Sequence, residues 1–122
     1  MPRPRSFLEN VHEADTAGGQ DTHRFALSVP DDLCFFEGHF PDFEILPGVA
    51  QLCVGVLPRC RQIRPGWTGP RRLTRVKFNR PIRPGDELEL VLVFDDARCA
   101  ARYHIDRGEE RCASGRLEFE RR

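Results

Sequence analysis

The sequence predicts an α+β domain in which a curved antiparallel sheet wraps around a central buried helix. One stretch before residue 30 and several after residue 72 alternate apolar and polar residues, as half-buried strands do. Between them, residues 49–57 are apolar on nearly every side, which is typical of a helix covered by other structure. A strand, a buried helix and then a run of strands together indicate this fold class.

The N-terminal part of the chain supplies one clear strand. Residues 1–6 are rich in Pro and Arg, and we expect them to form a loose arm. Residues 7–14 have a weak pattern that fits either a strand or a short helix. Residues 23–29 alternate regularly, with apolar side chains at every second position, so we expect a half-buried strand there.

The apolar segment 49–57 admits two interpretations, a buried strand or a buried helix. Gly55 and Pro58 both disfavour a helix. A segment that continues to Ile63 is nevertheless longer than an ordinary strand. We therefore expect a helix that is apolar all round, with a kink or a stop near Pro58.

The C-terminal half predicts four strands. Residues 73–79 have strand-like content, and residues 88–94 alternate after a turn at 83–86. Two further strands, at 97–105 and 111–119, are joined by a polar hairpin turn.

Length and composition exclude several classes of protein. The 122 residues are expected to form a single domain, 1–122, with one core. Because 19 basic residues balance 19 acidic ones, a dedicated nucleic-acid binder is not expected. The mean hydropathy is −0.51 and no apolar run spans a membrane or follows the basic N-terminus, so we expect a cytoplasmic chain without a membrane partner. Five cysteines and four histidines lack metal-site spacing, so we expect no disulfide framework, no metal and no cofactor.

The segment FFEGHFPDFEILPGV, residues 35–49, is the richest in chemical signals. His39 is surrounded by aromatic residues, which favour its neutral, proton-accepting form. Gly48 lies at the expected start of the helix, where unpaired backbone N–H groups can stabilise a developing oxyanion. A base, an oxyanion donor and an apolar pocket indicate proton abstraction beside a carbonyl. The alternative is a structural histidine in a Phe-rich turn, and spacing alone leaves both open.

Two stretches of the sequence resemble a known family. Residues 38–49, with Gly-His-Phe-Pro followed by Ile-Leu-Pro-Gly-Val, resemble the signature of the 3-hydroxyacyl-(acyl-carrier-protein) dehydratases, the FabA/FabZ-like hotdog proteins. Residues 76–88 resemble the strand–turn–strand of the same family, and the likeness extends loosely over residues 25–119. The resemblance implies a hotdog fold that dimerises edge to edge, with the active site at the dimer interface.

The same resemblance implies dehydration of 3-hydroxyacyl thioesters of acyl carrier protein to trans-2-enoyl thioesters. The setting would be fatty-acid, aryl-polyene or polyketide-type synthesis. Carried over to this sequence, His39 is the base and the Gly48 N–H polarises the thioester carbonyl. The residues expected to contact the substrate are Phe36, Phe40, Phe43, Val49 and Gln51.

Cys53 occupies the position at which the family pattern has a catalytic Glu or Asp. The Gln-Leu pair just before it resembles the aryl-polyene-pathway subgroup, in which an acidic residue is also expected. Three explanations stay open: a slow enzyme in which Cys53 or a water stands in, another carboxylate in the role, or a degenerate subunit whose partner supplies the acid. Cys53 also fits a small apolar residue in the core of a buried helix. The other candidate carboxylates are Glu37, Asp42 and Glu44.

A run from Arg59 to Arg83 contains nine basic residues and no acidic one. Such a surface attracts acidic partners, and acyl carrier protein is acidic and bears a phosphate that arginine binds well. The alternative is that arginines simply coat the surface. Trp67 is the one exposed-looking aromatic residue in this run, so no stacking platform for nucleic acid is evident. The residues expected to dock the carrier protein are Arg71, Arg72, Arg75, Lys77 and Arg80.

The leading hypothesis is therefore a dehydratase-like hotdog enzyme. The second is a catalytically degenerate or accessory subunit that binds acyl chains or a dehydratase partner. The third, a hotdog thioesterase, is disfavoured because residues 49–63 contain no Asp or Glu. Because a single sheet of this kind leaves an edge unpaired, we expect a homodimer or a heterodimer with a hotdog paralogue.

Overall fold

The computed structural model describes residues 6–16, 20–30 and 48–121. Expectations for residues 31–47, including His39, lie outside the described residues. The sheet consists of β1 (Leu8–Asp15), β2 (Asp21–Ser28), β3 (Trp67–Phe78), β4 (Glu87–Asp95), β5 (Ala100–Arg107) and β6 (Glu110–Arg121). One continuous helix comprises α1 (Gly48–Gln51), a π-helical turn (Leu52–Val56) and α2 (Leu57–Ile63).

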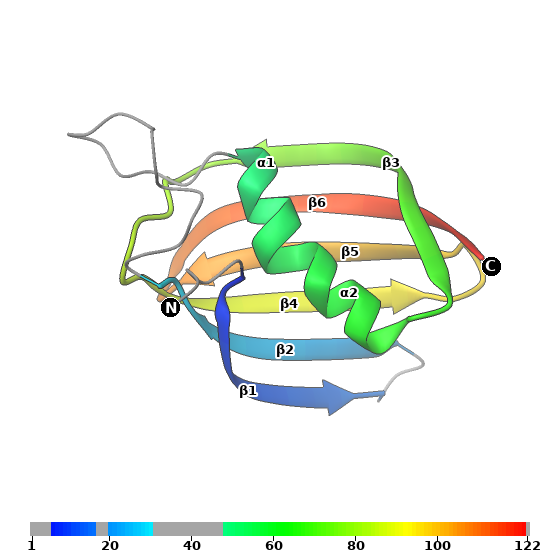
Figure 1. The fold of residues 1–122 in the computed structure, drawn as a ribbon, viewed down its shortest axis with the longest axis horizontal. Helices are drawn as coiled ribbons and strands as arrows, with labels where there is room; N and C mark the ends of the chain where they lie inside the picture. Colours follow the sequence, from blue (N-terminus) through cyan, green and yellow to red (C-terminus); the bar gives the residue numbers. More distant parts are fainter. Residues whose placement is uncertain (1–5, 17–19, 31–47, 122) are drawn as a thin grey trace, which may run out of the picture.

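The six strands form one antiparallel sheet in the order β1-β2-β4-β5-β6-β3. The helix crosses one face of this sheet, and β1 and β3 are its two edges (Figure 1). The expected α+β architecture is therefore confirmed. In the described ranges, no helix is long and apolar enough to cross a membrane.

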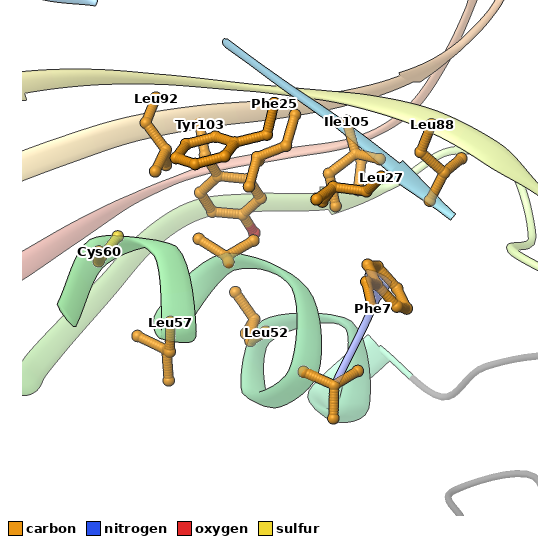
Figure 2. Packing of buried hydrophobic residues seen from close by; sticks show 14 of the residues in the cluster. Phe7, Phe25, Leu27, Leu52, Leu57, Cys60, Leu88, Leu92, Tyr103 and Ile105 are labelled. Atoms are coloured by element: carbon orange, nitrogen blue, oxygen red, sulfur yellow. The ribbon is translucent and has the colours of Figure 1, made fainter. Parts of the chain in front are cut away.

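The core lies between the helix and the sheet. Apolar side chains that alternate along β2 and β4 face the helix, and β5 adds Tyr103 and Ile105 (Figure 2). The helix contributes Leu52, Val56 and Cys60, each with at most 7% of its surface exposed. Burying one such aliphatic side chain stabilises the fold by roughly 1.5–3 kcal/mol.

The helix does not stop at Pro58 but continues to Ile63, so of the two alternatives expected there, a kink or a stop, the stop is excluded. In a regular α-helix the Val54 carbonyl would accept the N–H that Pro58 lacks, and the proline ring would crowd that carbonyl. Here the preceding turn widens to a π-helix, and the Val54 carbonyl accepts hydrogen bonds from the Phe7 N–H (3.1 Å) and the Ser6 hydroxyl (2.9 Å). The segment before β1 thus supplies the donor that the proline removes.

Arg59 stabilises the same contact between the helix and the segment before β1, although its place in the basic run suggested a surface residue. The residue is 4% exposed, and its guanidinium donates to the carbonyls of Val54 (3.1 Å) and Phe7 (2.7 Å) and to the Ser6 hydroxyl (2.7 Å). Burial lowers the pKa of Arg59, and the nearby Glu9 carboxylate, 3.5 Å away, opposes that shift. Ser6, expected in the loose arm, is therefore fixed to the helix.

Several boundaries and environments also differ from the predictions. Residues 7–14 were undecided and form β1 from Leu8 onward, whereas β5 begins at Ala100 because Asp96–Cys99 form a turn. The helix is not covered all round, since Cys53 and Arg61 are exposed. Trp67 is half-buried against the rings of Phe94 and Phe119 (centroids 5.7 and 5.4 Å apart), so it is not an exposed aromatic platform.

Candidate active site

The start of the helix is built around Gly48 and Phe78. A Cβ at Gly48 would lie 2.7 Å from two ring carbons of Phe78, which projects from β3. Only glycine therefore lets this ring lie directly against the helix start, where backbone N–H groups have no partner within the helix. Phe78 is itself 50% exposed, so the ring forms one open wall beside the expected oxyanion donor.

Cys53 lies on the π-helical turn and is exposed, whereas its neighbours Leu52 and Val54 are buried. The interpretation of Cys53 as a core residue was therefore wrong. An exposed thiol on this helix is accessible to a substrate or to another subunit. π-Turns of this kind are frequent at functional sites because they widen the helix locally.

The second cysteine of the helix has the opposite environment. Cys60 is 2% exposed, and burial raises the pKa of its thiol to about 12, with the Arg61 charge opposing this shift. Burial likewise raises the pKa of Tyr103 to about 12. Both groups stay protonated at neutral pH, so neither serves as a base.

The expected substrate-contacting residues are only partly described. Gln51 is 3% exposed and therefore lies within the packed part of the helix rather than on its open side. The backbone of Val49 belongs to α1. Its side chain and all of Phe36, Phe40 and Phe43 lie outside what is described, as do the candidate carboxylates Glu37, Asp42 and Glu44.

The five expected docking residues are all exposed on β3 or just after it. Arg72 lies 3.6 Å from Glu118 and Arg80 lies 3.4 Å from Glu110, as exposed ion pairs of small energetic weight. In the described ranges, Arg71, Arg75 and Lys77 have no carboxylate within ion-pair distance.

The basic run from Arg59 to Arg83 does not form one surface. Arg59 is buried, and Arg64 binds Asp21 and Asp96 while its guanidinium carbon lies 4.6 Å from the centroid of the Phe94 ring. The expected basic surface is therefore confined to the cations on and beside β3.

Sequence reasoning missed Phe78 as a member of the site. It was assigned to a strand by its composition, and its approach to Gly48 depends on how β3 passes the helix start. The sequence does contain one signal for such a role, since Phe78 is an apolar residue among basic neighbours just before a turn.

Comparison with known proteins identifies the family. The family model described as ApeI dehydratase matches residues 14–116. The chain is 33% identical over 97 residues to the 3-hydroxyacyl-(acyl-carrier-protein) dehydratase FabZ of Clostridioides difficile, covering 70% of this chain and 66% of that relative. It is 31% identical over 114 residues to FabZ of Streptococcus pyogenes, covering 81% of this chain and 78% of that protein.

A solved structure agrees with these relatives. The dehydratase heterocomplex ApeI:P from Xenorhabdus doucetiae superposes with a TM-score of 0.80 at 27% identity, covering 95% of this chain and 99% of that one. The hotdog fold and the implied 3-hydroxyacyl-(acyl-carrier-protein) dehydratase function in fatty-acid or aryl-polyene synthesis are thereby confirmed. The chain belongs to the ApeI-like family of hotdog dehydratases.

Proposed function

We propose that this chain supplies one half of a shared dehydratase site, and that a partner hotdog subunit supplies the acid. The observation that carries the proposal is the exposed Cys53, a thiol on the open side of the helix at the position where the family pattern has a carboxylate. A thiol is a weaker acid than a carboxyl group, and loss of one acid–base partner costs about 10²–10⁴-fold in rate.

The proposed reaction uses two groups of this chain. His39 takes the α-proton of the 3-hydroxyacyl thioester, and the electron pair moves onto the thioester carbonyl oxygen. The Gly48 N–H donates to that oxygen while it carries negative charge. When the carbonyl re-forms, the C3–O bond breaks, and the leaving hydroxyl takes a proton from the partner's acid. The products are the trans-2-enoyl thioester and one water.

The charge of β3 supports a partner other than a second copy of this chain. As a sheet edge, β3 offers unpaired backbone groups to another strand. Its sequence WTGPRRLTRVKF contains four cations and no acidic residue. Antiparallel pairing with a second β3 brings like charges together, and each such pair is unfavourable by about 0.2–1 kcal/mol.

A paralogue with an acidic edge strand removes this repulsion. The related ApeI:P structure is described as a heterocomplex. We extend that arrangement to this chain, with acyl carrier protein docking beside the cations of the edge. An accessory, non-catalytic subunit is the competing outcome, because it too is compatible with an exposed thiol at position 53.

The pairing is tested with an acidic-edge copy of this chain, defined by the substitutions Arg71→Glu, Arg75→Glu and Lys77→Glu. Light scattering at micromolar concentration and low salt is expected to show little dimer for the natural chain or the copy alone, and dimer in the 1:1 mixture. Addition of salt should weaken the mixed dimer because it screens the attraction. A natural chain that forms a tight dimer insensitive to salt would contradict the proposed partner choice.

Catalysis is tested by adding Cys53→Asp to the acidic-edge copy. The mixture with the natural chain should form enoyl thioester at least about tenfold faster than the same mixture with Cys53 retained, since a general acid contributes 10²–10⁴-fold. Cys53→Ser in the copy is the matched control and should give no increase. Equal rates in all three mixtures would favour the accessory-subunit function.

A further inference from the structure

A groove of about 360 Å³ lies on the face of the sheet opposite the helix. It is lined by residues of β3, β4, β5 and β6. The outward residues His104, Ser114 and Arg116 alternate with the core-facing residues Ile105, Ala113 and Leu117. Among the residues that the structure describes, no carboxylate lines this groove. The cations that line the groove are Arg75, Lys77, Arg102, Arg111 and Arg116.

A β-bulge places Arg75 in this groove. The register of β3 against β6 shifts between Thr74 and Lys77, so one extra residue of β3 is accommodated there. Arg75 occupies the bulge with φ 54°, a left-handed conformation that is strained for a non-glycine residue. The bulge gives β3 an additional outward cation within a short distance of Lys77.

Among the described residues, three of these cations have no counter-charge within ion-pair distance. Arg116 lies 3.3 Å from Glu118 and Arg111 lies 2.6 Å from Asp106, and both carboxylates stand outside the groove. In the part of the chain that is described, Arg75, Lys77 and Arg102 have no carboxylate within ion-pair distance. The adjacent larger groove shares Arg75, Arg102 and Arg116 with this one, and its lining also includes the carboxylates Asp21, Asp95, Asp96 and Glu118.

The neutral groups of the groove also suit an anion. Burial lowers the pKa of His104, as does the Arg111 charge, with Asp106 and Glu89 opposing, and the lowered pKa favours the neutral imidazole. A neutral imidazole has one N–H donor, and the Nε2 of His104 lies 3.5 Å from the Asp106 carboxylate. Ser114 adds a hydroxyl donor, and it pairs with Lys77 across the β3–β6 ladder.

We propose that this groove binds a phosphate group, held by the guanidinium and ammonium groups of Arg75, Lys77 and Arg102. Arginine matches phosphate oxygens with two parallel hydrogen bonds, and a dianion balances mutually repelling cations. The groove shares Arg75 and Lys77 with the proposed docking surface but lies across the sheet from Gly48 and Cys53. Pairing at the β3 edge uses backbone groups in the plane of the sheet, but the acidic side chains of the proposed partner would compete for Arg75 and Lys77. The groove is therefore tested on the natural chain alone.

The phosphate has two possible sources, a free phosphorylated compound or the phosphopantetheine arm of a carrier protein. Calorimetric titration at low salt with pyrophosphate in one arm and 4′-phosphopantetheine in the other separates them. The natural chain should bind at least one of the two ligands at a single site. The ligand that binds more tightly identifies the source.

The variants Lys77→Gln and Arg102→Gln should each weaken binding at least about fivefold, and the double variant more than tenfold. Arg61→Gln removes an exposed arginine of α2 on the other side of the sheet and should change affinity by less than twofold. Arg75→Gly deletes a cation while relaxing the strained backbone, so it should weaken binding without loss of stability.

Failure of both ligands to bind, or equal binding by all variants including Arg61→Gln, would overturn the phosphate site. The titration involves no turnover, so a negative result leaves the dehydratase proposal unaffected. Conversely, a chain that binds phosphate but has no dehydratase activity would support the phosphate site and not the dehydratase proposal.

Discussion

The two halves of the helix are built for different purposes. The first half, residues 48–53, presents Gly48 to the ring of Phe78 and leaves Cys53 exposed. The second half, residues 54–63, is held by Arg59, which binds the segment before β1, and by Arg64 directly after it, which binds Asp21 and Asp96. Variants in the first half should therefore change turnover, whereas variants in the second half should change stability.

The largest expected effect is on the stability of the second half. Arg59→Met removes the ion-pair partner of Glu9, the guanidinium donor of the Phe7 carbonyl and one of three donors to the Val54 carbonyl, and breaking a buried charged network costs about 3–5 kcal/mol. Urea unfolding measures this loss. Arg61→Met, on the exposed side of α2, should cost less than about 0.5 kcal/mol. Similar losses in both variants would show that burial of Arg59 is unimportant.

Gly55 tests where the boundary between the halves lies. A Cβ there would stand 2.8 Å from a ring carbon of Phe7, which is 3% exposed and has little room to move. Gly55→Ala should therefore destabilise the fold by about 1–3 kcal/mol through overpacking. Gly66→Ala is the control, because its Cβ would meet no atom within 4 Å. A neutral Gly55→Ala would extend the functional half of the helix past residue 55.

Gly48→Ala should act on the rate rather than on the fold. The new methyl group must displace the half-exposed ring of Phe78, so the helix start shifts and turnover falls about tenfold or more with little change in melting temperature. Adding Phe78→Leu should restore part of the rate, because it removes the clash. Kinetics with a 3-hydroxyacyl carrier protein measure both variants, and a double variant no faster than Gly48→Ala would argue against this contact.

The smallest expected effect on stability concerns the ion pair between Arg64 and Asp21. Burial raises the pKa of Asp21, but the Arg64 hydrogen bond and the His23 and Arg64 charges outweigh it, so the pKa lies below its ordinary value of 3.8. Stability from this lowered pKa is present above pH 3.8 and is lost as the pH falls through the folded-state value. Asp21→Asn should therefore cost about 1 kcal/mol or less at pH 7.

The difference in the free energy of unfolding between Asp21→Asn and the natural chain should become smaller when urea unfolding is repeated near pH 3. Asp95→Asn, whose exposed carboxylate lies 3.8 Å from Arg98, is a control with a weaker ion pair and should cost less at pH 7. A difference that persists unchanged in acid would mean that the charge of Asp21 does not act through Arg64.

Local patterns predicted the strands wherever one face is buried. β2 and β4 bury alternate residues and were recognised, whereas all eight residues of β1 are exposed and carry no alternation to recognise. The helix was recognised by its length, but its persistence through Pro58 depends on Ser6 and Phe7, which are distant in sequence. No local pattern contains that contact.

The candidate site was likewise predicted only where the signal is local in the sequence. The family pattern placed Gly48 at the start of the helix and Cys53 on it, as observed. The family pattern does not show which side of the helix Cys53 occupies. The apolar residues on either side of Cys53 suggested that it is buried, whereas it is exposed. In the sequence, Arg59 was one of nine residues in a basic run, and nothing there distinguished it as buried. Arg102 is distant in sequence from Arg75 and Lys77, and the register of the strands places it beside them in the proposed phosphate groove.

The most direct test of the shared site asks which chain supplies the base and which the acid. The natural chain is mixed with an acidic-edge copy that carries Cys53→Asp and His39→Ala, and intact-mass spectrometry follows a 3-hydroxyacyl carrier protein. The account predicts loss of one water in the mixture, with neither chain active alone and no loss when His39→Ala is also placed in the natural chain. Loss of water by the natural chain alone at the rate of the mixture, or a mixed dimer that leaves the substrate unchanged, would contradict it.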